Sequence, residues 1–380
     1  MKELILTPLK NENRGGDIIR SCSISRLNEG KEETSSQILW FQFPKVTEAP
    51  ASDDCDSYLL SMLLEGMKEN RKIIVKGSVS LELLSNLVEL QSAWNKWLPK
   101  KYNVVDIEVD LIREPELRKK GAVCAFSGGV DATFSVWRHS QKKHSYRSQQ
   151  INLCALIHGF DIPLTEQKAF DNAFIRAEKT LLDLELKLVQ IKTNYREISK
   201  VLWPHSHALA LVAALNQLKY QAGTGLIGSS ESYDSLVIPW GSSPITDHLL
   251  SSDEFTVIHD GASHNRTEKV SEIAEWTTGA NNLRVCWEGD VKDKNCGKCE
   301  KCIRTKLNFL ACGFSIPKCF PTDTNLTEQI IKLKFRNDVE RTEWAEIIKH
   351  ADKNNIKADW KKAANTVIKR KSWYNFIKLK

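Results

Sequence analysis

VCAFSGGVDATFS, at residues 123–135, is the stretch that decides the fold we predict for this 380-residue chain. An apolar run of strand character stops at Ser127, two glycines follow, and Asp131 stands just before a new apolar pattern that begins a helix. Glycine allows a tight turn and a close approach of backbone N–H groups to a ligand. Free N–H groups at the start of a helix favour an anion. The stretch therefore predicts a strand, a phosphate-binding turn and a helix.

Strand and helix patterns alternate after this turn. Three more apolar segments and two helical patterns follow in turn: NLCALIHGF (152–160), 165–185, LKLVQIKTN (186–194), 205–220 and AGTGLIGSS (222–230). Such alternation implies parallel βαβ units with helices on both faces of the sheet. Ligands of these sheets bind beyond the carboxyl ends of the strands. We therefore predict an α/β fold with a doubly wound parallel sheet over residues 119–320, with Ser127 at its ligand edge.

Two regions flank this predicted domain. Residues 1–115 contain the strand-like segments SQILWFQFP and RKIIVKGSVS, and we expect an N-terminal α+β extension of unknown role. Residues 321–380 are expected to form a basic helical C-terminal region. Residues 331–380 hold 14 Lys/Arg against 6 Asp/Glu, whereas the whole chain carries +6. Either flank could contact a protein or nucleic-acid partner, but a solvated helical face explains the basic tail equally well. An oligomer also stays open.

Four cysteines form a metal-binding pattern, C-x9-C-x2-C-x2-C, at Cys286, Cys296, Cys299 and Cys302. Four thiolates can close a tetrahedral Zn²⁺ site, and a site with all four positions filled is structural. An iron–sulfur cluster is the alternative. The other cysteines are scattered, which indicates a reducing compartment such as the cytoplasm. The chain has no apolar stretch of membrane-spanning length and no secretory signal pattern, so we expect no membrane segment.

The glycine turn supplies the candidate phosphate ligands. Ser127, Gly128, Gly129 and the Val130 N–H would hold phosphate groups. Asp131 is itself anionic, so it would bind Mg²⁺ that bridges phosphate oxygens. The turn is not a Walker loop, because no Gly-Lys-Ser/Thr follows, and it is not the dinucleotide fingerprint. A tight turn without any ligand remains the alternative.

The S-G-G-x-D sequence resembles the phosphate-binding loop of the PP-loop ATP pyrophosphatases. That resemblance implies a HUP-like fold, ATP as substrate and Mg²⁺ as cofactor. Enzymes of this superfamily cleave ATP between the α and β phosphates and transfer AMP to a substrate oxygen, after which a nucleophile displaces the AMP. The usual loop ends in serine, where this chain has Ala132. Thr133 stands one position later and is a further candidate for phosphate binding.

The turn and the cysteines together, in this order, resemble the 7-cyano-7-deazaguanine synthases. The matching residues are Cys286-Trp287-Glu288-Gly289 and Asn295-Cys296-Gly297-Lys298-Cys299-Glu300-Lys301-Cys302, with Arg304 after them. The likeness covers residues 120–313, half of the chain. It implies ATP-dependent activation of a deazaguanine carboxylate for attack by ammonia. Residues 229–261 depart from the D-S-G-Y-P-D-C-like substrate run of that family. Enlarged relatives occur in bacterial defence and modification systems, some attaching a deazaguanine to another macromolecule.

Further candidates lie at the ends of the predicted strands. Gly228 and Ser229 end the fourth apolar segment and could contact the nucleotide. Arg266 and Lys269 lie three residues apart on a predicted helix and would stabilise the departing pyrophosphate. We therefore assign Ser127, Asp131, Arg266 and Lys269 to catalysis. A solvated helix start is the alternative for the two cations.

The segment after the second predicted strand reads His158-Gly159-Phe160-Asp161. Its glycine would let adenine approach the backbone. Asp161 would hold the ribose or a second metal ion, and we place His158 with them as a nucleotide-binding residue.

We therefore expect an ATP-dependent ligase that adenylates a small carboxylate for attack by ammonia or an amine. Three alternatives remain. One is a PP-loop enzyme that thiolates or amidates RNA, with the basic tail on the phosphates. Another forms an amide on a peptide or protein docked by residues 1–115. The last is a nucleotide-binding subunit without catalysis, in which Ala132 marks lost activity.

Overall fold

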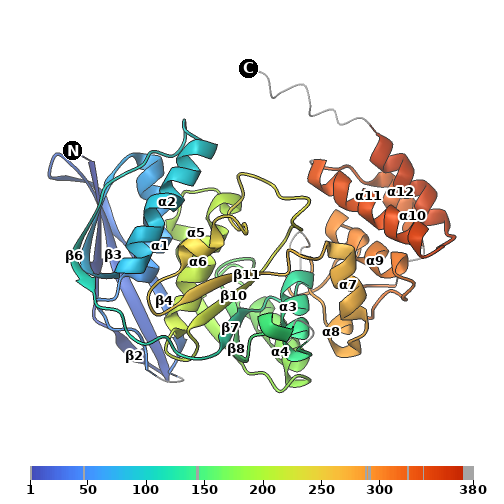
Figure 1. Ribbon diagram of the computed structural model, residues 1–380, viewed down its shortest axis with the longest axis horizontal. Helices are drawn as coiled ribbons and strands as arrows, with labels where there is room; N and C mark the ends of the chain where they lie inside the picture. Colours follow the sequence, from blue (N-terminus) through green and yellow to red (C-terminus); the bar gives the residue numbers. More distant parts are fainter. Residues whose placement is uncertain are drawn as a thin grey trace.

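One continuous sheet of eleven strands runs through the molecule in this computed structural model (Figure 1). The structure describes residues 2–45, 48–142, 145–286, 289, 292–322, 325–336 and 338–370. Its strands follow one another in the order β11-β10-β7-β8-β9-β4-β3-β1-β5-β6, and β2 pairs with β3 at one side. The prediction of an α/β chain with a large, mostly parallel sheet is confirmed.

The parallel half of the sheet contains five strands, all of which run in one direction. They are β7 (Ala122–Ala125), β8 (Ile151–His158), β9 (Leu188–Thr193), β10 (Thr224–Gly228) and β11 (Thr256–Asp260). From β7 the chain first builds β8 and β9 on one side and then returns to build β10 and β11 on the other. This reversal opens a crevice at the carboxyl ends of β7 and β10, where open α/β sheets bind ligands.

The N-terminal segment continues the same sheet and does not form one of its own. Its strands are β1 (Lys2–Pro8), β2 (Glu12–Arg14), β3 (Asp17–Asn28), β4 (Lys31–Pro44), β5 (Lys72–Ser80) and β6 (Ile107–Arg113). The junction is an antiparallel pairing of β4 with β9, in which Phe41 faces Thr193 and Gln42 faces Lys192. The sheet is thus antiparallel from β9 to β1 and parallel again from β1 to β6.

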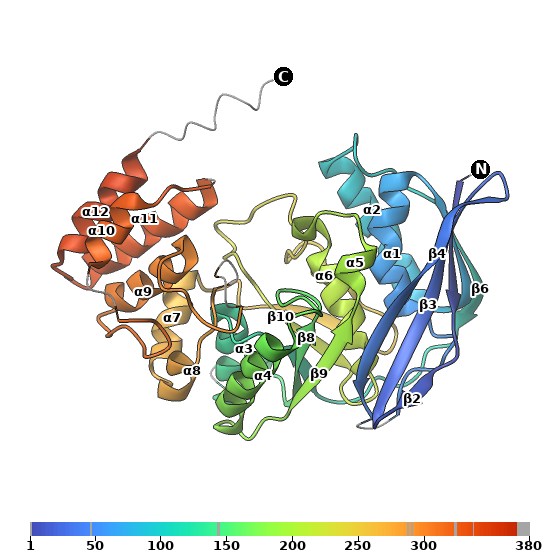
Figure 2. The same cartoon turned by 180° about the vertical axis from the view of Figure 1, so that it is seen from behind.

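Helices cover both faces of the parallel strands (Figure 2). One face packs against α6 (Trp203–Leu215), and its core includes Val123 and Leu153. The same core extends to α1 (Asp56–Glu69) and α2 (Leu81–Trp97), which pack on β5 of the N-terminal segment. The other face packs against α3 (Val130–Ser140) and α4 (Gln167–Leu182), and its core includes Cys124 and Cys154. Alternate residues of one strand thus enter two different cores, which is why these strands read as unbroken apolar runs.

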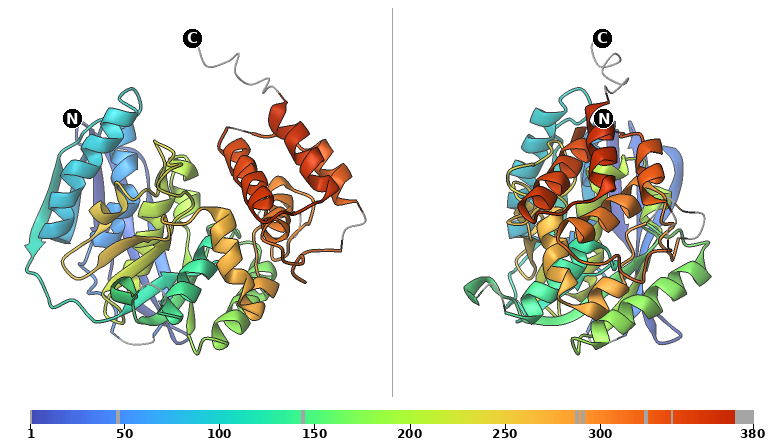
Figure 3. Two further views of the ribbon diagram at one scale, coloured as in Figure 1. Left: turned by 45° about the vertical axis from the view of Figure 1, so that its right-hand side comes forward. Right: turned by 90° about the vertical axis from the view of Figure 1, so that its right-hand side faces the viewer.

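The C-terminal part is helical, as the sequence predicts. It contains α7 (Arg266–Ala274), α8 (Thr277–Asn281), α9 (Glu300–Ala311), α10 (Leu326–Lys332), α11 (Asp338–Lys353) and α12 (Asp359–Lys369). The last three pack against α9 around a separate core that includes Ile303, Leu307 and Trp344 (Figure 3). Residues 371–380 of the basic tail lie outside the described residues. The remaining short helices are Ser145–Arg147, Tyr195–Ile198, Asn216–Leu218 and Asp247–Leu250.

The described chain contains no helix with both the length and the apolar character needed to cross a membrane.

A buried ionic network joins the N-terminal segment to the parallel half. The Lys219 ammonium contacts Asp54 and lies 3.1 Å from Glu254 Oε2. The Arg113 guanidinium lies 2.7 Å from Asp56 Oδ2 and 3.0 Å from Glu254 Oε2. Lys219 is fully buried, so its loss would leave three buried carboxylates with Arg113 as the remaining cation of the network.

Replacing Lys219 with methionine should therefore lower the free energy of unfolding by about 3–5 kcal/mol, the usual cost of breaking a buried ion pair on one side. Denaturant unfolding followed by circular dichroism measures this change. The matched control is Lys72→Met, which removes an exposed pair with Glu108 and should change the free energy of unfolding far less. Equal stabilities of the two variants would contradict the role of the network.

Candidate functional site

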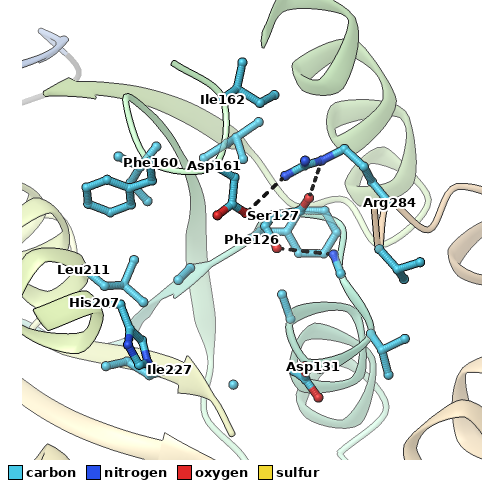
Figure 4. A pocket seen from close by; sticks show the side chains of 18 of the residues that line it. Phe126, Ser127, Asp131, Phe160, Asp161, Ile162, His207, Leu211, Ile227 and Arg284 are labelled. Carbon is cyan, nitrogen blue, oxygen red and sulfur yellow. Dashed lines mark hydrogen bonds and ion pairs between the residues drawn. The ribbon is translucent and has the colours of Figure 1, made fainter. Parts of the chain in front are cut away.

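A cavity of about 280 Å³ lies at the carboxyl ends of β7, β8 and β10, close to the lower end of the size range of ligand pockets. Its walls come from the turn after β7, the loop after β8, the end of β10, and helices α6, α7 and α9. Figure 4 shows one apolar side, with Phe160, Leu211 and Ile227, and one polar side, with Ser127, Asp131 and Arg284. The cavity thus occupies the switch point of the sheet, where the sequence places the ligand edge.

The glycine turn has the geometry of an anion site. Gly128 has a φ of +75°, which favours glycine, and Gly129 is the N-cap of α3. The Gly129 N–H donates to Ser127 Oγ at 3.3 Å. The first helical bond runs from the Thr133 N–H to the Gly129 carbonyl at 2.9 Å, so the three N–H groups before it have no partner within the helix. Those groups, together with the helix dipole, favour a bound anion.

Asp131 is held by two cations from α7. Its Oδ1 lies 3.1 Å from Lys269 Nζ and its Oδ2 lies 3.3 Å from Arg266 Nη1. Burial raises the pKa of Asp131, but the charges of Lys269 and Arg266 outweigh burial and hold the pKa below its usual range. Lys269 Nζ also donates to Ser229 Oγ at 2.9 Å. Gly228 packs on the first turn of α3, since a Cβ there would lie 2.9 Å from the Asp131 backbone. Strand β10, α3 and α7 therefore meet at one carboxylate.

These contacts bear on the predicted Mg²⁺ ligand. Both oxygens of Asp131 already contact a cation, so a Mg²⁺ bound to Asp131 would lie close to the positive charges of Lys269 and Arg266. These charges disfavour direct coordination of Mg²⁺ by Asp131. Asp161 also lines the cavity, and its side chain is 46% exposed, with Arg284 Nη2 at 3.8 Å. Asp161 is thus the freer carboxylate of the two.

Arg284 is a site residue that sequence reasoning missed. The backbone N–H of Arg284 donates to the Gly128 carbonyl at 2.7 Å. Its side-chain Nε donates to the Ser127 carbonyl at 3.3 Å. Figure 4 shows the guanidinium between Ser127 and Asp161. The only hint in the sequence is the position of Arg284, two residues before the first cysteine of the metal pattern.

A further cation reaches the cavity from the first turn of α9. Lys301 lines the cavity together with Arg266 and Arg284. Burial, followed by the charges of Arg266 and Arg304, lowers the pKa of Lys301 to about 8. A site in which cations disfavour each other's charge is stabilised by a bound anion.

Two of the predicted nucleotide-binding residues have packing roles instead of facing the cavity. The ring of His158 stacks on Phe170 with centroids 4.2 Å apart, and its Nε2 lies 2.9 Å from the Pro163 carbonyl. Gly159 has a φ of +103°, and a Cβ there would lie 2.0 Å from the Thr193 carbonyl oxygen. This glycine therefore lets the chain pass closely over β9.

The four cysteines of the predicted metal site come together. Their sulfur atoms all lie within 4.8 Å of one another, and this cluster could hold a metal ion such as zinc. The distances are 3.8 Å from Cys286 to Cys299 and 3.9 Å from Cys296 to Cys302. A tetrahedral Zn²⁺ with Zn–S bonds of about 2.3 Å places its sulfurs about 3.8 Å apart, so the donor set fits zinc. Trp287 and Glu288 of the sequence pattern lie outside the described residues.

The cluster is attached to the cavity at two points. Cys286 lines the cavity and follows Arg284 by two residues, while Cys299 is the N-cap of α9, which carries Lys301. Asn295 fixes the strand-like segment before Cys286, because its side chain accepts from Val285 N–H at 2.9 Å and donates to the Leu283 carbonyl at 2.8 Å. A bound metal would thus set the positions of both cations.

The structure brings some of the predicted site residues to the cavity wall and leaves others behind it. Those on the wall are Ser127, Gly129, Val130, Asp131, Asp161, Gly228 and Arg266. Gly128, Ser229 and Lys269 stand directly behind it, through the contacts described above. The Thr133 side chain is buried in α3.

Comparison of the chain with protein-family models, with curated proteins and with solved structures found no match.

Purified protein should contain about one zinc ion per chain, and Cys299→Ser should lose it, because three thiolates bind zinc more weakly than four. Elemental analysis measures the metal content. Cys312→Ser is the matched control, since the Cys312 sulfur donates to the Thr267 carbonyl at 3.6 Å and lies outside the cluster. Equal zinc in both variants would contradict the four-cysteine site, and iron in place of zinc would favour the iron–sulfur alternative.

Replacing His158 with glutamine should make stability less dependent on pH. Burial lowers the pKa of His158 in the folded state. As the pH falls below about 6.5, the imidazole is therefore protonated more readily in the unfolded chain than in the folded chain, and the free energy of unfolding decreases. This loss amounts to at most about 1.4 kcal/mol per pH unit. Denaturant unfolding at pH 7.5 and 5.5 should show a smaller difference for His158→Gln than for the wild type. A larger difference in the variant would contradict this.

Proposed function

We propose that the chain is an ATP-dependent adenylating enzyme that forms AMP and pyrophosphate. It activates a small carboxylate, with a deazaguanine carboxylate as the favoured substrate, for attack by ammonia or an amine. The observation that carries this proposal is the combination of the anion-binding turn after β7 with Arg266, Arg284 and Lys301 around one cavity. A triphosphate is a ligand that such a surplus of positive charge selects.

The two sides of the cavity support this choice of ligand. The phosphates would meet Ser127 and the free N–H groups at the start of α3. The base would lie toward the apolar side, where the Phe160 and Trp203 rings stand 5.0 Å apart. Cavities with an apolar wall and a few convergent polar groups are typical of nucleotide-sized ligands.

In the proposed reaction, the positive charges around the cavity stabilise the negative charge that develops on the leaving group. A carboxylate oxygen attacks the α-phosphorus, the bond to the bridging oxygen breaks, and pyrophosphate leaves with the electron pair. Arg266 stabilises that developing negative charge from the cavity wall, and Lys269 adds its positive charge from directly behind the wall. An amine then attacks the acyl carbon, loses its proton to solvent, and AMP departs. The chain contributes mainly position and electrostatic stabilisation.

The proposal also includes two metal ions, a cellular compartment and a binding partner. ATP would arrive with Mg²⁺ bound to its phosphates, and zinc at the four cysteines would hold Arg284 and α9 in place. None of the ten cysteines, all of which lie among the described residues, forms a disulfide, which favours a reducing compartment such as the cytoplasm. A protein or nucleic-acid partner could bind the N-terminal segment or the basic tail.

One specific observation favours a second candidate, a nucleotide-binding subunit without catalysis. Ala132 lines the cavity at the position where PP-loop enzymes carry serine, so a potential phosphate donor is missing there. In this case the chain would bind ATP without cleaving it.

Incubation of the protein with ATP, Mg²⁺ and carboxy-deazaguanine should release AMP and pyrophosphate, detected by chromatography and mass spectrometry. Lys269→Met should lower this rate by about 10²–10³-fold, the usual effect of removing one group that stabilises developing charge. The matched control is Lys76→Met, which removes a half-exposed lysine paired with Asp110 and should leave the rate unchanged.

Because Lys269→Met also leaves Asp131 with one fewer partner, Ser127→Ala provides an independent variant with the same expected direction. ADP as the only nucleotide product would reject cleavage between the α and β phosphates. Binding of ATP without pyrophosphate release would favour the non-catalytic subunit.

A further inference from the structure

Strand β6 forms one edge of the eleven-stranded sheet. It pairs with β5 on one side, and no strand of the described residues covers its other side. An uncovered edge presents a row of backbone N–H and C=O groups to another strand, and natural edges are usually protected by proline, lysine or a bulge. The sequence of β6, IEVDLIR, contains neither proline nor lysine, and the one register shift in the pairing inserts a residue in β5, not in β6. The edge is therefore open to a further strand.

The two faces of β6 carry different side chains. Ile107 and Val109 pack against the core to which α2 contributes, and Leu111, on the same face by alternation, is 58% exposed. Glu108 and Asp110 lie on the opposite face and pair with lysines of β5. Both carboxylate side chains are more than half exposed, so each can accept a further hydrogen bond from a cation. The edge thus fits a strand with apolar residues on the α2 side and basic residues on the other.

The C-terminal end of the chain has this pattern in its sequence. Residues 371–380 read KSWYNFIKLK, and the last four alternate the apolar Ile377 and Leu379 with the basic Lys378 and Lys380. Alternate residues of an extended segment point to opposite faces. The two apolar side chains would therefore meet the α2 side of β6, while the two lysines meet its two carboxylates. Cross-strand pairs of opposite charge and of apolar residues are the contacts that stabilise a sheet.

We propose that residues 371–380 of one copy bind as an added strand to the free edge of β6 of a second copy, and that the chain assembles through this contact. The pairing joins copies because the segment follows α12, and α12 and β6 lie at opposite ends of the molecule (Figures 1 and 2). Ten residues span at most about 35 Å, which is less than the diameter of about 55 Å of a compact chain of this length. The same ten residues are enough to run along the whole of the seven-residue β6.

This inference does not rest on the proposed function. The lining of the 280 Å³ cavity contains no residue before Ala125, whereas β6 and α2 both belong to the N-terminal segment. Assembly through β6 therefore leaves that cavity uncovered by the contact itself. It also gives the N-terminal segment, whose role the sequence leaves open, a function in holding copies of the chain together.

Sedimentation velocity of the full-length protein over a hundredfold range of concentration tests the proposal, and we expect association that increases with concentration. A reversed-tail variant, Lys378→Glu with Lys380→Glu, should raise the dissociation constant at least fivefold, because glutamates would then face the carboxylates of β6. The matched control is Lys353→Glu with Lys357→Glu, which reverses two exposed lysines at and after the end of α11 and should leave association unchanged.

An exchange of charges separates strand pairing from unspecific attraction. A chain that carries Glu108→Lys and Asp110→Lys in addition to the reversed tail should associate at least fivefold more tightly than the reversed-tail variant, because opposite charges again face each other. Both carboxylates are exposed, so these substitutions should leave the circular dichroism spectrum unchanged.

A synthetic peptide provides a test without substitutions in the edge. The peptide KSWYNFIKLK should bind the reversed-tail variant in a fluorescence anisotropy titration and, in excess, should dissociate the full-length assembly. A scrambled peptide of the same composition lacks the alternation and should bind at least fivefold more weakly.

The proposal is overturned if the full-length protein stays monomeric over the whole range, if the exchange of charges restores nothing, or if the scrambled peptide binds equally well. Association that neither the reversed tail nor the peptide changes would also overturn it, in favour of direct pairing between β6 strands of two copies.

Discussion

The contacts of Asp131 with Lys269 and Arg266 are the interaction on which the site depends. They join the first turn of α3 to α7, and Lys269 extends the junction to Ser229 at the end of β10. Helices α3 and α7 also pack through an apolar core that includes Phe134 and Val270. The charge pairing adds to that core and sets Arg266 on the wall of the cavity.

The four-cysteine cluster acts as a second anchor. It lies between the segment that carries Arg284 and the helix that carries Lys301, so a metal ion there would fix both cations relative to the glycine turn. Metal binding and the shape of the cavity are then coupled, since a small displacement of Cys286 or Cys299 would move a charge that lines the cavity. The cluster has four protein ligands, which suits this positional role better than a role in chemistry.

Regions that look separable along the chain are not separable in space. The N-terminal segment shares the sheet through β4 and β9, and the Lys219–Arg113 network joins it to the parallel half. The last helices pack on α9, and Glu343 and Glu346 of α11 line a cavity of about 350 Å³ that Arg266 also lines. The parallel half of the sheet and its loops therefore contact both the N-terminal segment and the C-terminal helices.

The sequence by itself determined the parallel α/β core, the glycine turn at the end of β7 and the four-cysteine pattern, because these depend on local periodicity and short spacing. It missed β11, a five-residue strand within a polar stretch. Only the tertiary structure decided that Arg284 contacts the turn and that His158 packs on Phe170 away from the cavity. It also decided that Asp131 is paired with cations. These outcomes depend on which side chains come into contact in the folded chain. The spacing of residues along the sequence does not determine those contacts.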